Sequence, residues 1–453
     1  MQTPRAMLTR RKFLIMGTLV MPAIQSLRLG SNPRVRFLSY EQVEPLLKTG
    51  KLVPPADRAA WPRWIQNHDR EIRSRLLRGE EDTLANFVLY GFSFTNQPRE
   101  ATAARVQDFI AGLLMPGNNE RLLLLKNLVT RLGYRAATPA ERERLARYLS
   151  ENAARYAAEQ QRYGRTLDNA LSNDTRNAFS STSQLYRDRG LSIDTDFRPN
   201  YAIEQALANL KRRGVLSRVR RAAVIGPGLD FADKNSGFDF YPLQTLQPFA
   251  LVDSLVRFGL AEPSTLRLTV FDISSQTLDH VSRAVRLARG RQPYTIQLVL
   301  DKNHSWNQNA LDYWRRFGDR VGTAVAPLPA PPQIQSVEQR AVRIRPEVVT
   351  LLEPQSLNVV VQHVELRPER QFDLIVATNV FVYYDTFEQG LSLLNIESML
   401  SGGGIFLSND VSQDVPGLKL RAIDNVSVEY SKADADRVQV YSKTTFAPQL
   451  PPI

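Results

Sequence analysis

The sequence of 453 residues contains no cysteine, and this absence excludes disulfide bonds, thiolate metal sites and cysteine nucleophiles. Histidine is also scarce, and the four histidines lack metal-ligand spacing: they are His68, His280, His304 and His363. Neither a G-x-S-x-G elbow nor an H-E-x-x-H motif is present. The sequence therefore gives no support to a hydrolase or to a metal site.

Acidic residues are missing from the first 40 positions, which explains much of the net charge of +12. More than half of that excess comes from seven basic residues before Glu41, namely Arg5, Arg10, Arg11, Lys12, Arg28, Arg34 and Arg36. The rest of the chain has only a mild positive charge, and it lacks a basic stripe interleaved with aromatic residues. We therefore expect no nucleic-acid partner.

The N-terminus also lacks an apolar run long enough to span a bilayer comfortably. Arg10 and Arg11 precede a short apolar segment that ends near Ala23. Residues 1–30 resemble a twin-arginine export signal, which predicts a periplasmic or membrane-tethered protein. Cleavage after Ala23 would place Met21 where a small residue is preferred, so an uncleaved membrane tether stays open. The alternative is the basic start of a cytoplasmic protein.

The length favours two or three domains. Apolar residues recur at helical steps from residue 67 to 163, and Thr138-Pro139-Ala140-Glu141 is a capping-box start. Residues 171–199 are rich in polar residues and predict a linker, an ordered loop or an active-site lid. We expect a helical N-terminal region over residues 31–199 and an α/β domain over residues 200–453.

The α/β domain begins with an apolar run that leads into closely spaced glycines. After a helix near Ile203 to Lys211 comes Arg221-Ala222-Ala223-Val224-Ile225, which is followed by Gly226-Pro227-Gly228-Leu229-Asp230. A first parallel strand presents its loop to a nucleotide-like ligand in this way, because a Cβ would block the close approach of the backbone. The same residues would also suit an ordinary turn.

Further strands follow in the alternating order of a parallel sheet. Leu266 to Phe271 ends in Asp272, whose carboxylate could accept hydrogen bonds from ribose hydroxyls or cap the next helix. Later strands are predicted at Leu357–Val364, Phe372–Asn379, Leu400–Asp410, Val426–Tyr430 and Arg437–Tyr441. The insertion at about 294–354 is either a small subdomain or a long decorated loop.

The fourth-strand block resembles a known family. Phe372-Asp373-Leu374-Ile375, Asn379-Val380, Tyr383-Tyr384-Asp385 and the glycine turn before the fifth strand are similar to class I S-adenosylmethionine-dependent methyltransferases, most of all the CheR-type enzymes. The resemblance covers roughly residues 220–410. It implies a Rossmann-like methyltransferase fold, with a mostly parallel sheet and an antiparallel terminal strand, preceded here by the helical N-terminal region.

The resemblance also implies roles for individual residues. Those assigned to S-adenosylmethionine are the loop residues Gly226, Gly228 and Asp230, the ribose acceptor Asp272, and Asn379 and Val380 near the sulfur. Tyr383 would lie beside the methyl acceptor as the catalytic residue, although packing between strand and helix is the alternative. The acceptor, a protein or a small molecule, is not specified.

Three positions depart from the family pattern. Val224 stands where an acidic residue is usual, Asp230 replaces a loop glycine, and Thr378 replaces the arginine before the asparagine-valine pair. These departures, together with the export-like start, keep a second interpretation open. In it, the chain is an exported or membrane-tethered binding module that keeps a methyltransferase fold without catalysis.

Overall fold

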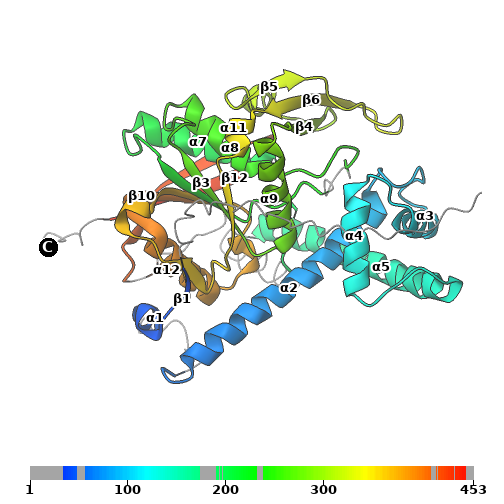
Figure 1. The fold of residues 1–453 in the computed structure, drawn as a ribbon, viewed down its shortest axis with the longest axis horizontal. Helices are drawn as coiled ribbons and strands as arrows, with labels where there is room; N and C mark the ends of the chain where they lie inside the picture. The colour runs from blue at the N-terminus through cyan, green and yellow to red at the C-terminus, as the bar shows by residue number, and fades with distance from the viewer. Residues whose placement is uncertain are drawn as a thin grey trace, which may run out of the picture.

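The computed structural model describes residues 34–47, 57–173, 190–192, 194–195, 197–231, 238–409, 415, 417–432 and 434–444, with backbone only for 163–173. The predicted export signal lies outside the described residues, and so does most of the predicted linker. Within the described part of the chain, no helix is both long and apolar enough to cross a membrane. Figure 1 shows a sheet with helices on both faces and a group of helices that projects to one side.

A seven-stranded sheet forms the centre of the C-terminal half. In spatial order its strands are β11 (Leu420–Glu429), β12 (Ala435–Lys443), β10 (Leu400–Ser408), β9 (Phe372–Ala377), β2 (Arg221–Ile225), β3 (Arg267–Asp272) and β7 (Leu352–Ser356). The strands from β10 to β7 are parallel, whereas β12 is antiparallel to both of its neighbours. The predicted fold class, a Rossmann-like methyltransferase sheet with an antiparallel strand near its end, is confirmed.

Helices cover both faces of this sheet. The helices outside the insertion are α1 (Tyr40–Leu47), α2 (Trp61–Tyr90), α3 (Thr102–Leu114), α4 (Glu120–Arg131), α5 (Pro139–Asn173), α7 (Arg198–Arg212), α8 (Gln247–Arg257), α9 (Ser275–Arg289) and α12 (Thr386–Met399). In β2, Ala222 and Val224 pack with α7, α8 and α9. Ala223 and Ile225 face the other side and share a core with α1, α12 and the first half of α2. Burial on both faces explains why the central strands are continuous apolar runs.

The second half of α2 belongs to a separate core with α3, α4 and the start of α5. The predicted capping box is present, since Thr138 N donates to Glu141 Oε2 at 2.9 Å and Glu141 N donates to Thr138 Oγ1 at 3.2 Å. Leu229 and Phe231, from the loop after β2, are buried in the same core. The helical region therefore holds the loop that was predicted to contact the cofactor.

The third strand of the sheet was predicted wrongly. It is β7, whereas the predicted segment contains β8 (Gln362–Val364), which pairs with β1 (Val35–Phe37). β7 is an edge strand that contains Pro354 and is mostly solvent-accessible, so it lacks an apolar run. The run Val359-Val360-Val361 is apolar because it is buried beneath α1 and α12.

The insertion is a small subdomain. It contains β4 (Tyr294–Asp301), α10 (Gln308–Arg316), β5 (Gly322–Val325), β6 (Val337–Ile344) and α11 (Pro346–Val349), with the strands in the antiparallel order β4-β6-β5. Tyr313 and Trp314 of α10 enter the main core. Arg316 pairs with the buried Glu204 of α7, with Nη1 2.8 Å from Oε2. These contacts fix the subdomain against the helices of one face.

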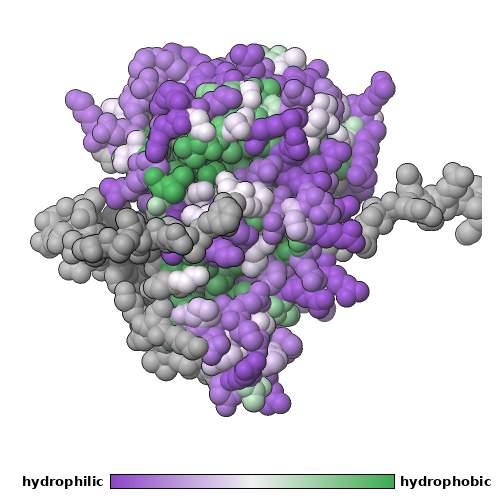
Figure 2. All heavy atoms as spheres, turned by 90° about the vertical axis from the view of Figure 1, so that its left-hand side faces the viewer, coloured by the Kyte–Doolittle hydropathy of each residue, from purple (hydrophilic) through white to green (hydrophobic). Residues whose placement is uncertain are grey.

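Figure 2 shows the side of the molecule that lies at the left of Figure 1, where β10 and α12 are found. Hydrophilic side chains cover most of this side, and apolar side chains reach the surface near its middle.

Candidate functional site

The carboxyl ends of β2, β3 and β9 meet at one edge of the parallel sheet, where α/β proteins bind their ligands. β2 leads into Gly226, β3 ends at Asp272, and β9 leads into Asn379. These are the three loops in which sequence analysis placed the cofactor residues. Two direct contacts between the loops define the geometry of the site.

The first contact joins the glycine loop to the loop after β9. Gly226 has a φ of 65° and Gly228 a φ of 64°, in the left-handed region that favours glycine. Gly226 N donates to Phe271 O of β3 at 2.8 Å. A Cβ on Gly226 would lie only 2.8 Å from Val380 Cγ2. The loop therefore needs glycine both for its conformation and for the close approach of Val380.

The second contact joins the glycine loop to Asp272, which is only 6% exposed. Burial raises the pKa of this carboxyl group to about 7, although backbone hydrogen bonds from Ser274, Gly228 and Ile273 favour its charged form. Ser274 N lies 2.7 Å from Asp272 Oδ1, and the Ser274 side chain itself caps α9. Asp272 is thus not the helix cap, and it links the second strand to the glycine loop.

Asp230 lies at the end of the same loop and is half-buried. Its carboxylate accepts hydrogen bonds from Tyr241 Oη at 3.1 Å and from Gln244 Nε2 at 2.7 Å. Its backbone N–H donates to Gln244 O at 2.7 Å. Asp230 therefore fastens the glycine loop to the segment that precedes α8.

Arg121 of α4 clamps this loop, and sequence analysis did not identify it. The buried guanidinium donates to the backbone carbonyls of Asp230, Phe231 and Tyr241. It also lies over the rings of Phe231 and Tyr241, 5.9 and 5.3 Å from their centroids. An arginine in the first turn of a helix has no distinctive sequence pattern, so nothing in the sequence alone would have identified this contact.

Asn379 is held by the fifth strand. It has a φ of 55°, which asparagine tolerates, and its N–H donates to Asn409 Oδ1 at 2.8 Å. Asn409 Nδ2 returns a hydrogen bond to Asn379 Oδ1 at 2.8 Å. The neighbouring Thr378 accepts a hydrogen bond from Gln247 Nε2 at 2.7 Å. Asn409 lies in the predicted polar end of the fifth strand, and this polar end is the sequence feature that could have indicated its place in the site.

Tyr383 lies in a short 3-10 helix, η2 (Phe381–Tyr383), between β9 and α12. It is half-buried and packs at the border of the core beneath α12, whereas Tyr384 is buried. Asp385 then caps α12 in a reciprocal capping box with Glu388. The turn that carries Tyr383 is therefore fixed at its C-terminal end.

The segment before α7 connects α2 to the glycine loop. Leu191 N donates to Arg75 O at 3.1 Å, and Thr195 N donates to Leu229 O at 3.0 Å. A Cβ on Gly79 would lie 1.9 Å from Leu191 O, so only glycine permits this approach to α2. α2 therefore contacts the site through the glycine loop as well as through α12.

No protein-family model and no curated protein matches the chain. A similar solved structure is the N-methyltransferase NodS from Bradyrhizobium japonicum WM9, with 12% identity, a TM-score of 0.27 and coverage of 55% of this chain and 99% of that chain. CurJ carbon methyltransferase has 13% identity, a TM-score of 0.24 and coverage of 89% and 99%. The rRNA methyltransferase aviRa from Streptomyces viridochromogenes has 9% identity, a TM-score of 0.25 and coverage of 52% and 84%. All three likenesses are distant.

Proposed function

We propose that the protein is an S-adenosylmethionine-dependent methyltransferase. The observation that carries this proposal is the convergence of three loops at one edge of the sheet. There, Gly228 hydrogen-bonds the buried Asp272, and Gly226 packs against Val380. A glycine loop, an acidic strand end and the segment after the fourth strand are the parts that bind this cofactor in the family that the sequence resembles.

The residues present fit the cofactor. Gly226 and Gly228, both in the left-handed region, keep side chains out of the loop, so that its backbone would be able to approach the methionine moiety closely. The carboxylate of Asp272 offers acceptor oxygens for the ribose hydroxyls. Asn379, fixed by Asn409, and Val380 complete the wall on the side of β9. The departure at Asp230 is compatible with this assignment, because its carboxylate is turned toward Tyr241 and Gln244.

The cofactor would supply a methyl group on a sulfonium whose departure leaves a neutral thioether, so little acid-base catalysis is needed. The protein would contribute mainly by holding the acceptor in line with the methyl group and by excluding water. Tyr383 is the residue that we assign to the acceptor, because it holds the family's tyrosine position in the turn between β9 and α12 and is half-buried at the border of the core.

Replacement of Tyr383 by phenylalanine tests this assignment. The loss of one hydroxyl should lower the methyl-transfer turnover by about 10- to 100-fold, the scale for a misplaced reactant, and should leave cofactor affinity nearly unchanged. The measurement is single-turnover transfer from labelled S-adenosylmethionine to the proteins and small molecules of a cell extract. Tyr134→Phe in the helical region, where Tyr134 stacks on Tyr148, is the matched control. Equal turnover in Tyr383→Phe and the wild type would remove Tyr383 from the site.

Calorimetric titration of the full chain with S-adenosylmethionine and S-adenosylhomocysteine tests the function itself. Binding of both compounds together with transfer of labelled methyl groups would support the enzyme. Binding without any labelled product would favour the second candidate, an exported or tethered binding module, which Val224, Asp230 and the paired Arg10 and Arg11 motivate. Failure to bind either compound would reject the methyltransferase.

A further inference from the structure

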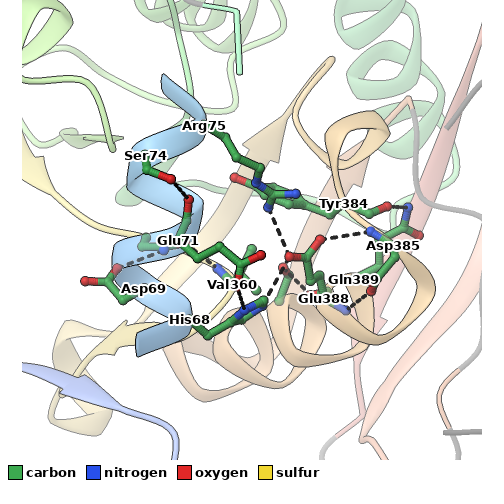
Figure 3. Close-up of polar contacts among 12 residues, drawn as sticks. His68, Asp69, Glu71, Ser74, Arg75, Val360, Tyr384, Asp385, Glu388 and Gln389 are labelled. Atoms are coloured by element: carbon green, nitrogen blue, oxygen red, sulfur yellow. Dashed lines mark hydrogen bonds and ion pairs between the residues drawn. The ribbon is translucent and has the colours of Figure 1, made fainter. Parts of the chain in front are cut away.

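The first half of α2 lies against α12, next to the turn that carries Tyr383. Trp61, Ile65 and Ile72 of α2 share one core with the buried residues of α12. The Trp64 and Phe387 rings lie 6.0 Å apart across the contact. Figure 3 shows side chains of α2 pointing toward Glu388 in the first turn of α12. The first half of α2 is therefore a structural neighbour of the proposed acceptor side.

His68 is at the centre of this contact. Its ring stacks on Trp64 with centroids 4.7 Å apart, and its side chain is only 14% exposed. Nδ1 lies 3.3 Å from Glu71 Oε2 on the same helix, and Nε2 lies 3.1 Å from Glu388 Oε1 on α12. The contact with Glu388 has ion-pair distance without in-line hydrogen-bond geometry. The imidazole thus lies between two carboxylates that belong to different elements.

Glu388 transmits this contact to the turn. Its side chain is 4% exposed, and Arg75 Nη2 donates to its Oε1 at 3.0 Å. Its Oε2 accepts from Asp385 N at 3.0 Å, while Asp385 Oδ1 accepts from Glu388 N at 2.8 Å. The Arg75 guanidinium also lies over the ring of Tyr384, 5.4 Å from its centroid. The Glu388 carboxylate therefore connects α2 to Asp385, and Arg75 contacts Tyr384, so that both residues after Tyr383 are held from α2.

Charge makes this connection sensitive to the state of His68. Burial alone would lower the pKa of His68, but attraction to the carboxylates of Glu388 and Glu71, together with the hydrogen bond to Glu71, outweighs burial and holds that pKa above its ordinary value. Burial alone would raise the pKa of Glu388, but His68 and Arg75 hold it below its ordinary value. The charged groups that face the pair are Glu71 and Arg75 from α2 and Asp385 from the start of α12.

We propose that His68 is a positioning residue for the acceptor side of the site: protonated, it holds Glu388, and through Glu388 it fixes the turn that carries Tyr383. This inference rests on the proposed function. As pH rises and His68 loses its proton, Glu388 keeps only Arg75 as a cationic partner, and the start of α12 is held less firmly. Methyl transfer should then decline as pH rises through the pKa of His68, while cofactor binding should not follow that group.

The first experiment observes the turn without catalysis. The full chain is prepared with ring-carbon-labelled tyrosine. The NMR signal of Tyr383 is the one that disappears in Tyr383→Phe. This signal should shift with pH, and the midpoint of its shift should equal the pKa of His68. The pKa of His68 is read from its own imidazole signal, since the chain has four histidines. In His68→Gln this shift of Tyr383 should disappear, and in Glu388→Gln the pKa of His68 should fall. A Tyr383 signal with the same pH dependence in His68→Gln and the wild type would overturn the proposal.

The second experiment measures transfer from labelled S-adenosylmethionine to cell extract, together with calorimetric titration with S-adenosylhomocysteine. At a saturating concentration of S-adenosylmethionine, His68→Gln should reduce turnover about 10-fold at low pH, within the loss that a displacement of about 1 Å produces, and should remove the decline in turnover as pH rises. Its affinity for S-adenosylhomocysteine should match the wild type. His304→Gln, the same substitution in the insertion, should behave as the wild type in both measurements. An unaltered pH profile in His68→Gln would refute the positioning role. Absence of transfer in the wild type would refute the proposed function, leaving the NMR result to decide on the contact.

Discussion

Asp272→Ala is expected to weaken the binding of S-adenosylmethionine by about 2 to 4 kcal/mol, the scale for two hydrogen bonds to a charged group. This corresponds to a roughly 30- to 1000-fold rise in Kd. The expectation follows from the position of Asp272 at the end of β3, where Gly228 N–H already contacts its carboxylate. Calorimetry at pH 8 measures the change, with circular dichroism as the check on folding. An unaltered Kd in a folded variant would remove Asp272 from the cofactor site.

The raised pKa of Asp272 adds a pH dependence to this prediction. Because burial places that pKa at about 7, the carboxyl group is mostly protonated at pH 6 and mostly ionised at pH 8. If the ionised form accepts the ribose hydroxyls, Kd should be about ten-fold weaker at pH 6 than at pH 8, in proportion to the ionised fraction. Asp272→Ala should lose this dependence. A wild-type affinity that does not vary between the two pH values would show that the ionised form is not required.

The sequence was sufficient to predict those parts of the fold that depend on local pattern. β2, β3, β9 and β10 are apolar runs with polar or glycine ends, and burial on both faces produces that signature. The helical period before residue 163 likewise reflects the burial of one face of each helix. β7 could not be predicted, because an exposed edge strand with Pro354 requires no apolar run.

The candidate site likewise has a part that could be predicted from the sequence and a part that could not. Gly226, Gly228, Asp272 and Asn379 follow strands directly, and the structure brings their loops together at one edge of the sheet. Some residues that hold the site come from the helical region, at least 100 positions earlier in the chain: Arg121 reaches the glycine loop, and His68 and Arg75 reach α12. A contact between distant segments leaves no periodicity in either of them, so its discovery required the structure.

These contacts also assign a role to the helical region that the sequence left open. Leu229 and Phe231 place the far end of the glycine loop inside the core of α2, α3 and α4. The loop is therefore shared between the sheet, which positions Gly226, and the helices, which bury the residues after Gly228. A change at this junction should disturb the loop without touching the proposed ligand contacts.

Arg121→Met is the sharpest test of that junction. The substitution keeps an unbranched apolar side chain, but it removes the donor from the buried carbonyl groups of Phe231 and Tyr241 and from the partly buried carbonyl group of Asp230. Each unsatisfied carbonyl group costs roughly 1 to 3 kcal/mol of stability. The variant no longer buries a charged group, which offsets part of this cost, so we expect the order of the loop to be destabilised by about 3 kcal/mol. The loss should be local, because the contacts of Arg121 all lie in one loop.

Amide hydrogen exchange of the full chain measures this local loss. Asp230 N–H, bonded to Gln244 O in the wild type, should exchange about 100-fold faster in Arg121→Met, since about 1.4 kcal/mol corresponds to a factor of ten. The affinity of Arg121→Met for S-adenosylhomocysteine should also fall, because the glycine loop must be ordered before it can bind the ligand. The matched control is Arg144→Met: exposed Arg144 also donates to a carbonyl, that of Gly133, and lies over the ring of Tyr134. Equal exchange at Asp230 in Arg121→Met and Arg144→Met would mean that the sheet alone orders the glycine loop.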